Sequence, residues 1–444
     1  MVYHINPTDD VLRTPYARNR RVVVTGLGVV AANGIGKEAF WDATSRGVSG
    51  IHPIERFSIA DQPLQVAGEV RNFVVSDYVD RKLANRTDRT THFVFAAVQE
   101  ALQDARLVLA EENSHRVGAV IANTLGGIEY VLEQMKALHV RGLRAMSAFS
   151  AIAWLQVANV GQTSIRYGIQ GYCKTPINDA VGGLDALGMA YSAIQRGAAD
   201  VIITGGCEAI IHPFILMVMA HSDHCTTGDD PNSYRPFDRR ASGLLLGEGA
   251  GICILEEYEH ARQRGAAIYG EIVGYGQTND AHGLLAPSSD GTQYARAIRL
   301  AMQEGNLQPQ DIGYFSLDGR AMPYSDAGEA EALHLVFGSE LAHLPVSVPR
   351  SMLGHSYAAA GAIDAVTALL AMRHGLVPPT IHCEQLEPRY ELDMVRDEAR
   401  SFSRPAVLLG GRGIGGANVA VAVKASDYTS ARSTLSCECQ SYSM

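Results

Sequence analysis

Residues 171–188, GYCKTPINDAVGGLDALG, have a pattern that could present a catalytic nucleophile. The pattern predicts an extended segment over residues 172–177, a sharp turn at residues 178–180, and a helix that begins at the small residues which follow. A thiol in such a turn would lie at the positive end of the helix, where its pKa falls and the thiolate is favoured. This sequence has Ala180 at that point, and a methyl group cannot form a thioester.

The cysteines do not supply an obvious replacement or a metal site. There are seven, an odd number scattered along the chain, which does not indicate a disulfide framework. Cys437 and Cys439 form a C-x-C pair without further ligands nearby. The glycines after Gly26 and Gly28 have the wrong spacing for a dinucleotide loop. We therefore predict no metal and no cofactor.

Other residues able to take part in chemistry occur later in the chain. His355 follows Arg350 by five residues in RSMLGH, and Asp318 lies in the segment SLDGR. A glycine-rich segment, GIGG, contains Ile414. Histidines and basic residues of this kind could stabilise a developing negative charge.

Together these motifs resemble the ketosynthases of fatty-acid and polyketide synthesis. They are most similar to the chain length factors of type II polyketide synthases, whose elbow ends in a similar Gly-Gly-Leu-Asp-Ala. The similarity runs from about Arg21 to about Lys424. Besides the elbow, its most specific part is residues 146–162, which resemble the dimer-interface loop and helix of chain length factors and contain Met146, Phe149 and Trp154.

The resemblance implies that the catalytic positions have degenerated. Ala180 stands where ketosynthases have Cys and chain length factors usually have Gln. Asp318 replaces the first of two histidines, and its carboxylate is expected to repel an enolate. Arg350 replaces a lysine, and Ile414 replaces the phenylalanine of a gate loop. His355 matches the second histidine, and the favoured interpretation is a retained, hydrogen-bonded core residue. We therefore predict no catalytic residue.

A helix is predicted from residue 128 to residue 138. Ile128, Val131 and Met135 fall at i, i+3 and i+7, so they form one stripe on it. The resemblance implies that this stripe lines the tunnel into which a polyketide chain grows, although a stripe at this spacing can also be ordinary core.

The leading hypothesis is a catalytically silent subunit that forms a heterodimer with an active, Cys-bearing ketosynthase and sets product length. An acyl carrier protein would act through that complex. Two alternatives stay open. One is a homodimeric condensing or thiolase-like enzyme that uses another nucleophile, such as Cys173 or Cys207. The other is a scaffold that only stabilises its partner.

Composition excludes several other classes of protein. The chain has 444 residues and a formal net charge of -10, which argues against nucleic acid or an anionic membrane as the main partner. No apolar run approaches the roughly 20 residues of a membrane span, and the N-terminal segment lacks the apolar core of a signal peptide. We expect a cytoplasmic protein.

Buried strands alternate with helices along the chain, which predicts an α/β layered protein. Two of the longer helices are expected around residues 292–304 and over residues 358–374. The resemblance implies the thiolase-like fold, with two duplicated α/β halves in layers. The expected boundaries are a polar N-terminal arm at 1–20, a first half at 21–260 and a second half at 261–426. A Ser-rich tail at 427–444 is expected to be disordered.

Overall fold

A computed structural model describes residues 20–222 and 224–426. Almost all of the predicted N-terminal arm, and the whole predicted tail at 427–444, lie outside the described residues. The strands are β1 (Val22–Ala31), β2 (Gly34–Ile35), β3 (His52–Pro53), β4 (Val66–Ala67), β5 (Val117–Ala122), β6 (Cys173–Lys174), β7 (Val201–Glu208), β8 (Gly249–Glu257), β9 (Gly270–Asn279), β10 (Ile312–Ser316), β11 (Val346–Ser347), β12 (Leu376–Val377), β13 (Arg400–Ser401), β14 (Ala406–Arg412) and β15 (Ala417–Lys424).

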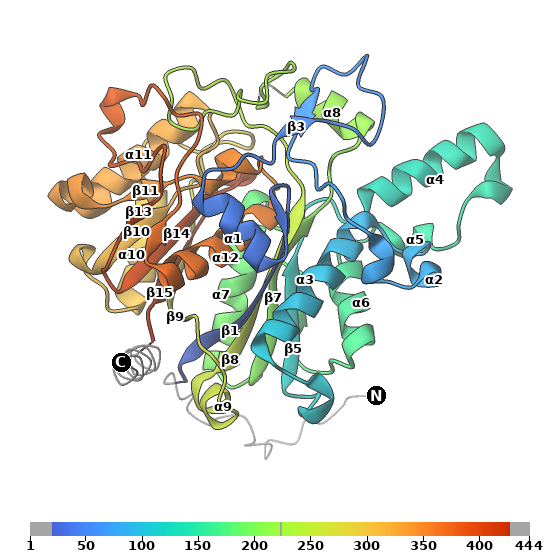
Figure 1. Ribbon diagram of the computed structural model, residues 1–444, viewed down its shortest axis with the longest axis horizontal. Helices are drawn as coiled ribbons and strands as arrows, with labels where there is room; N and C mark the ends of the chain where they lie inside the picture. Colours follow the sequence, from blue (N-terminus) through green and yellow to red (C-terminus); the bar gives the residue numbers. More distant parts are fainter. Residues whose placement is uncertain (1–19, 223, 427–444) are drawn as a thin grey trace, which may run out of the picture.

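The helices cover both faces of the sheet formed by most of these strands (Figure 1). They are α1 (Lys37–Ser45), α2 (Arg81–Ala84), α3 (Arg89–Ala105), α4 (Ile128–Arg141), α5 (Ser150–Ala153), α6 (Ala158–Tyr167), α7 (Gly182–Gln195), α8 (Pro213–Ala220), α9 (Tyr258–Gln263), α10 (Thr292–Glu304), α11 (Pro323–Phe337) and α12 (Ala358–His374). Within the described residues, no helix is both long and apolar enough to span a bilayer.

The main sheet has a duplicated topology. Its strand order is β11-β10-β14-β15-β9-β1-β8-β7-β5-β6, with β2 paired to β1. In the first half β5 is parallel to β6 and β7, and β8 is antiparallel to β7 and β1. In the second half β10 is parallel to β11 and β14, and β15 is antiparallel to β14 and β9. The halves join where Val22, Val23 and Val24 of β1 pair with β9, which confirms the expected thiolase-like fold.

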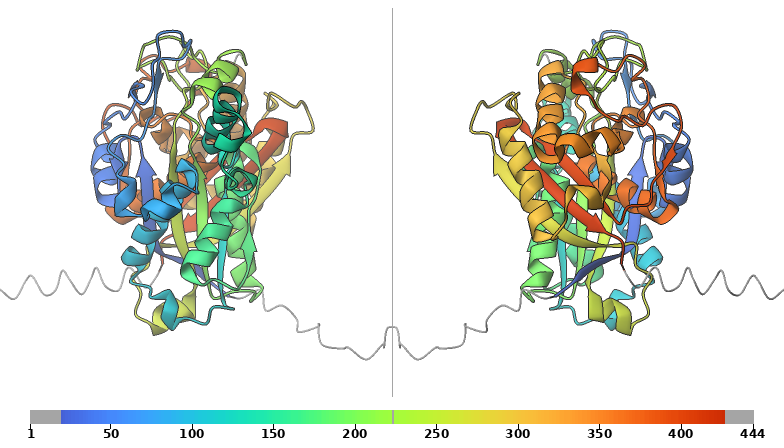
Figure 2. Two further views of the ribbon diagram at one scale, coloured as in Figure 1. Left: turned by 90° about the vertical axis from the view of Figure 1, so that its right-hand side faces the viewer. Right: turned by 90° about the vertical axis from the view of Figure 1, so that its left-hand side faces the viewer.

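Helices α7 and α12 form the central layer between the two halves of the sheet (Figure 2). Helix α7 contacts β5 and β7, while α12 contacts β7, β8 and β14. On the outer faces, α3 packs on β1 and β8, and α10 packs on β9 and β15. The central core therefore contains side chains from both halves, including Leu184, Ile363, Val29 and Val421.

Predicted and observed elements agree best where the helical periodicity is long. The predicted helix at 358–374 has the bounds of α12, and the predicted helix at 292–304 has those of α10. Of the extended segment expected over 172–177, only Cys173–Lys174 pair as a strand, β6, at the edge of the sheet. Helix α8 was not predicted.

Close contact between α7 and α12 depends on Gly183. A Cβ atom at this position would lie 2.5 Å from the carbonyl oxygen of Ala358 and 2.7 Å from the backbone nitrogen of Ala362. Both are backbone atoms of α12, so they cannot move aside as the end of a flexible side chain could. The small residue therefore fixes the distance between the two central helices.

We predict that Gly183→Ala destabilises the fold by about 1–3 kcal/mol, because overpacking costs that much and exceeds the gain of up to about 1 kcal/mol in helix propensity. Gly161→Ala in α6 is the matched control, since a Cβ there would meet no atom within 4 Å. It should leave stability unchanged or raise it slightly. Urea unfolding of the purified variants measures both, and equal effects would contradict the packing explanation.

Candidate functional site

The predicted elbow lies between β6 and the first turn of α7. Ala180 is part of a short 3-10 turn, Asp179–Val181, and is 1% exposed. Asp179 precedes it with a φ of 46°, a left-handed conformation unusual for a residue with a side chain. The Asp179 carboxylate accepts a hydrogen bond of 2.8 Å from the backbone N–H of Ile414. The elbow and the glycine-rich Ile414 loop are therefore tied together.

A cavity of about 470 Å³ opens beside this elbow. Its lining is mostly apolar, with a few polar groups, which is the composition of a small-molecule pocket. The lining residues are Thr124, Leu125, Asp179, Ile210, Ile215, Met219, His221, Ser222, His224, Leu285, Tyr357 and Ile414. The Thr124 turn is held by Glu208, which accepts hydrogen bonds from the N–H groups of Thr124 and Leu125 at 2.8 and 3.2 Å.

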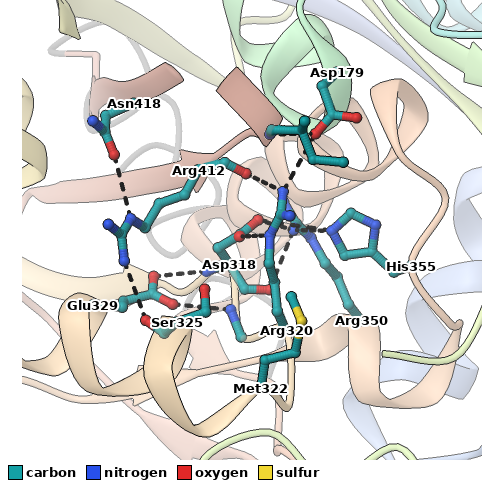
Figure 3. Close-up of polar contacts among 12 residues, drawn as sticks. Asp179, Asp318, Arg320, Met322, Ser325, Glu329, Arg350, His355, Arg412 and Asn418 are labelled. Atoms are coloured by element: carbon teal, nitrogen blue, oxygen red, sulfur yellow. Dashed lines mark hydrogen bonds and ion pairs between the residues drawn. The ribbon is translucent and has the colours of Figure 1, made fainter. Parts of the chain in front are cut away.

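Asp318 forms a buried cluster with two arginines (Figure 3), and one of them, Arg320, lies 3.6 Å from Asp179 of the elbow. The Oδ2 of Asp318 lies 2.8 Å from Nε of Arg320, and its Oδ1 pairs with Arg350. Arg350 also pairs with Asp364 of α12, at 2.7 Å between Nε and Oδ2. Burial by itself raises the pKa of Asp318, but the Arg320 and Arg350 charges outweigh it and hold that pKa well below its usual range.

Asp318 therefore differs from the bare, repelling carboxylate expected from the sequence. Its charge is balanced by two guanidinium groups, and all four charged side chains of the cluster are at most 3% exposed. A carboxylate held in this way accepts hydrogen bonds and cannot donate one. The position consequently cannot provide the hydrogen-bond donor that a neutral histidine would supply to an enolate.

Backbone contacts extend this cluster into neighbouring elements. The N–H groups of Asp318 and Gly319 donate to Glu329 of α11 at 2.8 and 2.9 Å. Burial raises the pKa of Glu329 to about 7. Arg320 also donates to the carbonyl of Arg412, the last residue of β14. The cluster thus joins β10, β14, α11 and α12.

His355 is fully buried among the same residues. Its Nδ1 accepts a hydrogen bond of 3.3 Å from the N–H of Tyr357, and its Nε2 lies 3.2 Å from Arg350 and 3.9 Å from Asp318. Burial lowers the pKa of His355 to about 4, and the nearby Arg350 charge acts in the same direction. The ring is therefore neutral at physiological pH. Tyr357, and not His355, reaches the cavity wall.

The two alternative nucleophiles occupy other surroundings. Cys207 is fully buried in β7, and its thiol contacts the carbonyl of Ala122 at 3.5 Å. Burial raises its pKa well above the ordinary value. Cys173 lies on β6, 3.3 Å from the Ser164 hydroxyl, and is not part of the cavity lining. Among the described residues, no group of three or more His, Cys, Asp or Glu side chains is arranged to hold a metal ion.

The predicted tunnel residues lie on α4, which extends away from the main body (Figure 1). Ile128 is half-buried and packs against the apolar cluster that includes Ile210 and Ile215 of the cavity wall. Val131 is also half-buried, whereas Met135 is 41% exposed. None of the three predicted residues is part of the cavity lining.

The predicted interface residues lie on the adjoining surface. Met146 is half-buried, while Phe149 and Trp154 are 38% and 43% exposed. More apolar side chains are exposed on α4, α5, α6 and their connections, namely Val140, Leu143, Ile152, Val157 and Ile165. We call these seven exposed residues, from Val140 to Ile165, the apolar surface. Exposed apolar side chains mark an interaction site where they form a contiguous patch.

Some residues of the site had no clear signal in the sequence. Arg320 is adjacent to the SLDG motif, but its pairing with Asp318 depends on how the loop folds. Tyr357 contributes to the cavity because it turns at a φ of 47° just before α12. Helix α8, which supplies Ile215 and Met219, could have been found from Pro213, because proline favours the first position of a helix.

Comparisons with known proteins agree with this fold. Residues 19–261 match the profile of the beta-ketoacyl synthase N-terminal domain, and residues 269–384 match that of the C-terminal domain. Among solved structures, one of "the ishigamide ketosynthase/chain length factor" superimposes with a TM-score of 0.86 and 28% identity, over 92% of this chain and 99% of that one. A type II polyketide synthase acyl-carrier protein in complex with its ketosynthase, bound to the hexaketide, gives a TM-score of 0.84 and 29% identity, over 92% and 100% of the two chains.

Two kinds of curated relative match over nearly their whole length. The tetracenomycin polyketide synthase ketoacyl synthase beta subunit of Streptomyces glaucescens is 38% identical over 91% of this chain and 98% of its own length. A 3-oxoacyl-[acyl-carrier-protein] synthase 2 of Staphylococcus aureus is 36% identical over 92% of this chain and 99% of its own. The chain belongs to the beta-ketoacyl synthase family.

Proposed function

We propose that this chain is a catalytically silent ketosynthase homologue. It pairs with an active, Cys-bearing ketosynthase and shapes the tunnel that limits polyketide length during decarboxylative condensation of malonyl units on an acyl carrier protein. The observation that carries the proposal is Ala180 at the elbow, beside a buried cluster in which Asp318 is paired with Arg320 and Arg350. The match to a polyketide synthase beta subunit and to a ketosynthase/chain length factor structure supports it.

Two chemical requirements of the condensation support the proposal that this chain is not itself catalytic. Holding the growing acyl chain needs a nucleophile, and stabilising the enolate needs hydrogen-bond donors. Ala180 offers no nucleophilic atom, and Asp318 is an acceptor already bound by two cations. His355 remains, but its Nε2 faces Arg350 at 3.2 Å and its ring is not on the cavity wall.

The exposed apolar side chains support the proposed pairing with a second subunit. Trp154, Val157 and Ile165 are 43%, 56% and 79% exposed in the single chain. Burying such side chains is favourable at about 25 cal/mol for each Å² of apolar area. The edge strand β6 lies at the end of the sheet in the same half of the molecule, and unpaired strand edges are usually covered. A ketosynthase partner could bury this surface in an obligate interface, which commonly exceeds about 2,000 Å².

Helix α4 supports the role in chain length. Ile128 packs in the apolar cluster that also supplies two residues of the cavity wall, so the helix adjoins the cavity. Val131 and Met135 continue the stripe towards the part of α4 that projects from the body. A partner covering the apolar surface would enclose this stripe, and its side chains would then form one wall of the proposed tunnel.

The similarity to 3-oxoacyl synthases over 92% of the chain favours a second candidate, a homodimeric condensing enzyme. Such an enzyme would need a nucleophile elsewhere in the chain, because Ala180 has no nucleophilic atom. Cys207 is fully buried, and neither Cys207 nor Cys173 lines the cavity. The chain expressed without a partner distinguishes the two candidates, because only the second condenses malonyl units by itself.

Replacing Ala180 by Cys should not create a ketosynthase. The helix N-terminus would favour a thiolate, so the new thiol could be acylated. Asp318 would still occupy the place of a donor, and losing one such donor costs about 10²–10³ in rate. In a pair whose partner has lost its own Cys, elongation by Ala180→Cys should stay at least about 100-fold below that of the intact pair.

Ala180→Ser is the matched control for this experiment, because a serine side chain is nearly the size of a cysteine side chain but forms no thiolate. Radiolabelled malonyl incorporation into extended products provides the measurement. Elongation by the Cys variant within tenfold of the intact pair would show that Asp318 does not block the chemistry.

Enlarging the stripe on α4 should shorten the product without stopping condensation. Val131→Phe would obstruct the proposed tunnel, and forcing a longer chain past it would cost about 1–3 kcal/mol of overpacking. Roughly 1.4 kcal/mol changes the partition between extension and release about tenfold. Because the catalytic Cys lies on the partner, the early cycles should proceed normally. Mass spectrometry of the products from the reconstituted pair measures the change.

Lys136→Phe provides the control, since it places the same ring at an exposed position on a different face of α4. It should leave the length distribution unchanged. If Val131→Phe also leaves it unchanged at full activity, the stripe is ordinary core. A uniform loss of all products would instead indicate damaged folding or pairing.

A further inference from the structure

Helix α4 contacts the body of the protein at its first turn, and beyond that turn it packs chiefly on the segment that follows it, at Leu143–Ala145 and Ser150–Ala153. All of its 14 residues are described, and Ala137 is the one side chain among them that is fully buried. Its last turn is exposed, with Val140 at 75%, and the helix projects from the body (Figure 1). The contacts at Ile128, Glu129 and Tyr130 therefore help to set the direction of α4, together with the packing of Leu132 and the hydrogen bond from the Ser147 N–H to Gln134.

One buried carboxylate caps both α3 and α4. Asp88, which is 2% exposed, precedes α3, and its Oδ1 accepts a hydrogen bond of 2.8 Å from the N–H of Thr90. Its Oδ2 accepts one of 2.8 Å from the N–H of Tyr130, the third residue of α4. Gly127, the residue just before α4, provides no side-chain cap for that helix. Asp88 therefore satisfies an N–H group that would otherwise have no partner within the helix.

Two further contacts hold the same turn. Arg56 pairs with Glu129 at 2.6 Å and also lies 3.3 Å from the buried Glu248. Gly127 is pressed between neighbours, because a Cβ atom there would lie 2.0 Å from the carbonyl of Ala153 and 2.9 Å from Cβ of Asp88. The start of α4 is thus fixed from three sides, and Asp88 is the contact that links it directly to α3.

We propose that Asp88 is a positioning residue that sets the direction of α4 and, through it, the length of the acyl chain that the complex produces. The inference rests on the proposed function, in which the stripe on α4 forms a tunnel wall. A helix of this length spans about 20 Å, so a rotation of about 5° at its first turn moves its far end by about 2 Å. Displacements of this size are comparable with the bond lengths by which an acyl chain grows in each cycle.

The substitution Asp88→Asn separates the two caps. The Asn carbonyl can still accept from the N–H of Thr90, as asparagine does at helix N-caps. Its NH₂ group then faces the N–H of Tyr130 and cannot accept from it. The variant therefore keeps the cap of α3 and removes the direct link to α4.

The matched control is Asp80→Asn. Asp80 caps α2 by accepting from the N–H groups of Lys82 and Leu83, and these contacts are local to α2. A second variant, Glu129→Gln, weakens the pairing with Arg56 from the α4 side. It tests the same anchor should Asp88→Asn fail to fold.

Two measurements on the reconstituted pair test the proposal. Hydrogen exchange should show faster exchange, by about tenfold, in the first turn of α4 for Asp88→Asn, with α3 unchanged. The ratio of the longest product to the next shorter one should change at least threefold, while the total condensation rate stays within twofold. Glu129→Gln should shift the ratio in the same direction, and Asp80→Asn should shift neither quantity.

The pH dependence of the product ratio adds a further readout, which would not change if Asp88 only stabilised the fold. Burial raises the pKa of Asp88 to about 6, so the carboxyl gains a proton as pH falls through that value and can no longer accept from both helices. The titratable and charged groups near it are Arg89 and His92 of α3, Glu129 and Glu133 of α4, Arg56, and Cys207 of β7. Burial lowers the pKa of His92 to about 4, so that ring does not titrate between pH 5.5 and 7.5. The product ratio should shift over this range in the parent and stay flatter in Asp88→Asn.

An unchanged product ratio in both Asp88→Asn and Glu129→Gln would overturn the proposal. Val131→Phe, measured in parallel, then separates the causes. If Val131→Phe shortens the product while the two anchor variants do not, the positioning role is wrong and the proposed function stands. If all three leave the ratio unchanged, the role of α4 in chain length fails as well.

Discussion

The pairing of the buried Asp318 carboxylate with Arg320 and Arg350 is the constraint on which the rest of the site depends. A buried charge is tolerated only when it is compensated, and removing one partner of such a pair typically costs about 3–5 kcal/mol. Each guanidinium therefore has to stay in place. Arg350 is held in turn by Asp364 of α12, and Arg320 by the carbonyl of Arg412 at the end of β14. At the position of Asp318, the site therefore contains a paired carboxylate that holds the structure together and cannot donate a hydrogen bond.

The duplicated fold brings these residues together from distant parts of the sequence. Strands β10 and β14 are neighbours in the second half of the sheet, so Asp318 and Arg320, in the loop after β10, lie close to Arg412 at the end of β14. Helix α12 packs against α7 in the central layer, which brings its first residues next to the elbow at Ala180. The same architecture could support catalysis or a silent subunit. The side chains placed on it decide between the two.

Much of the fold could be predicted from the sequence, because long helices and buried strands have strong periodic patterns. The bounds of α10 and α12 agree with the predicted ranges for this reason. Short elements such as β6 have too few residues for a pattern and are defined by pairing across the sheet. The site was only partly predictable. The positions of Asp318, His355 and Arg350 could be identified from motifs, whereas the balance of charge around Asp318 depends on Arg320, whose contacts follow from the loop conformation. The double role of Asp88 could not be predicted either, since its link to Tyr130 spans 42 residues.

The proposed division of labour can be tested by locating the covalent intermediate. In a reconstituted pair supplied with malonyl units and quenched during turnover, intact-protein mass spectrometry gives the mass of each subunit separately. We expect the acyl adduct on the ketosynthase partner, with the mass of this chain unchanged. An acyl adduct on this chain at a level comparable with that on its partner would contradict the central claim that its degenerate site takes no covalent part in the reaction.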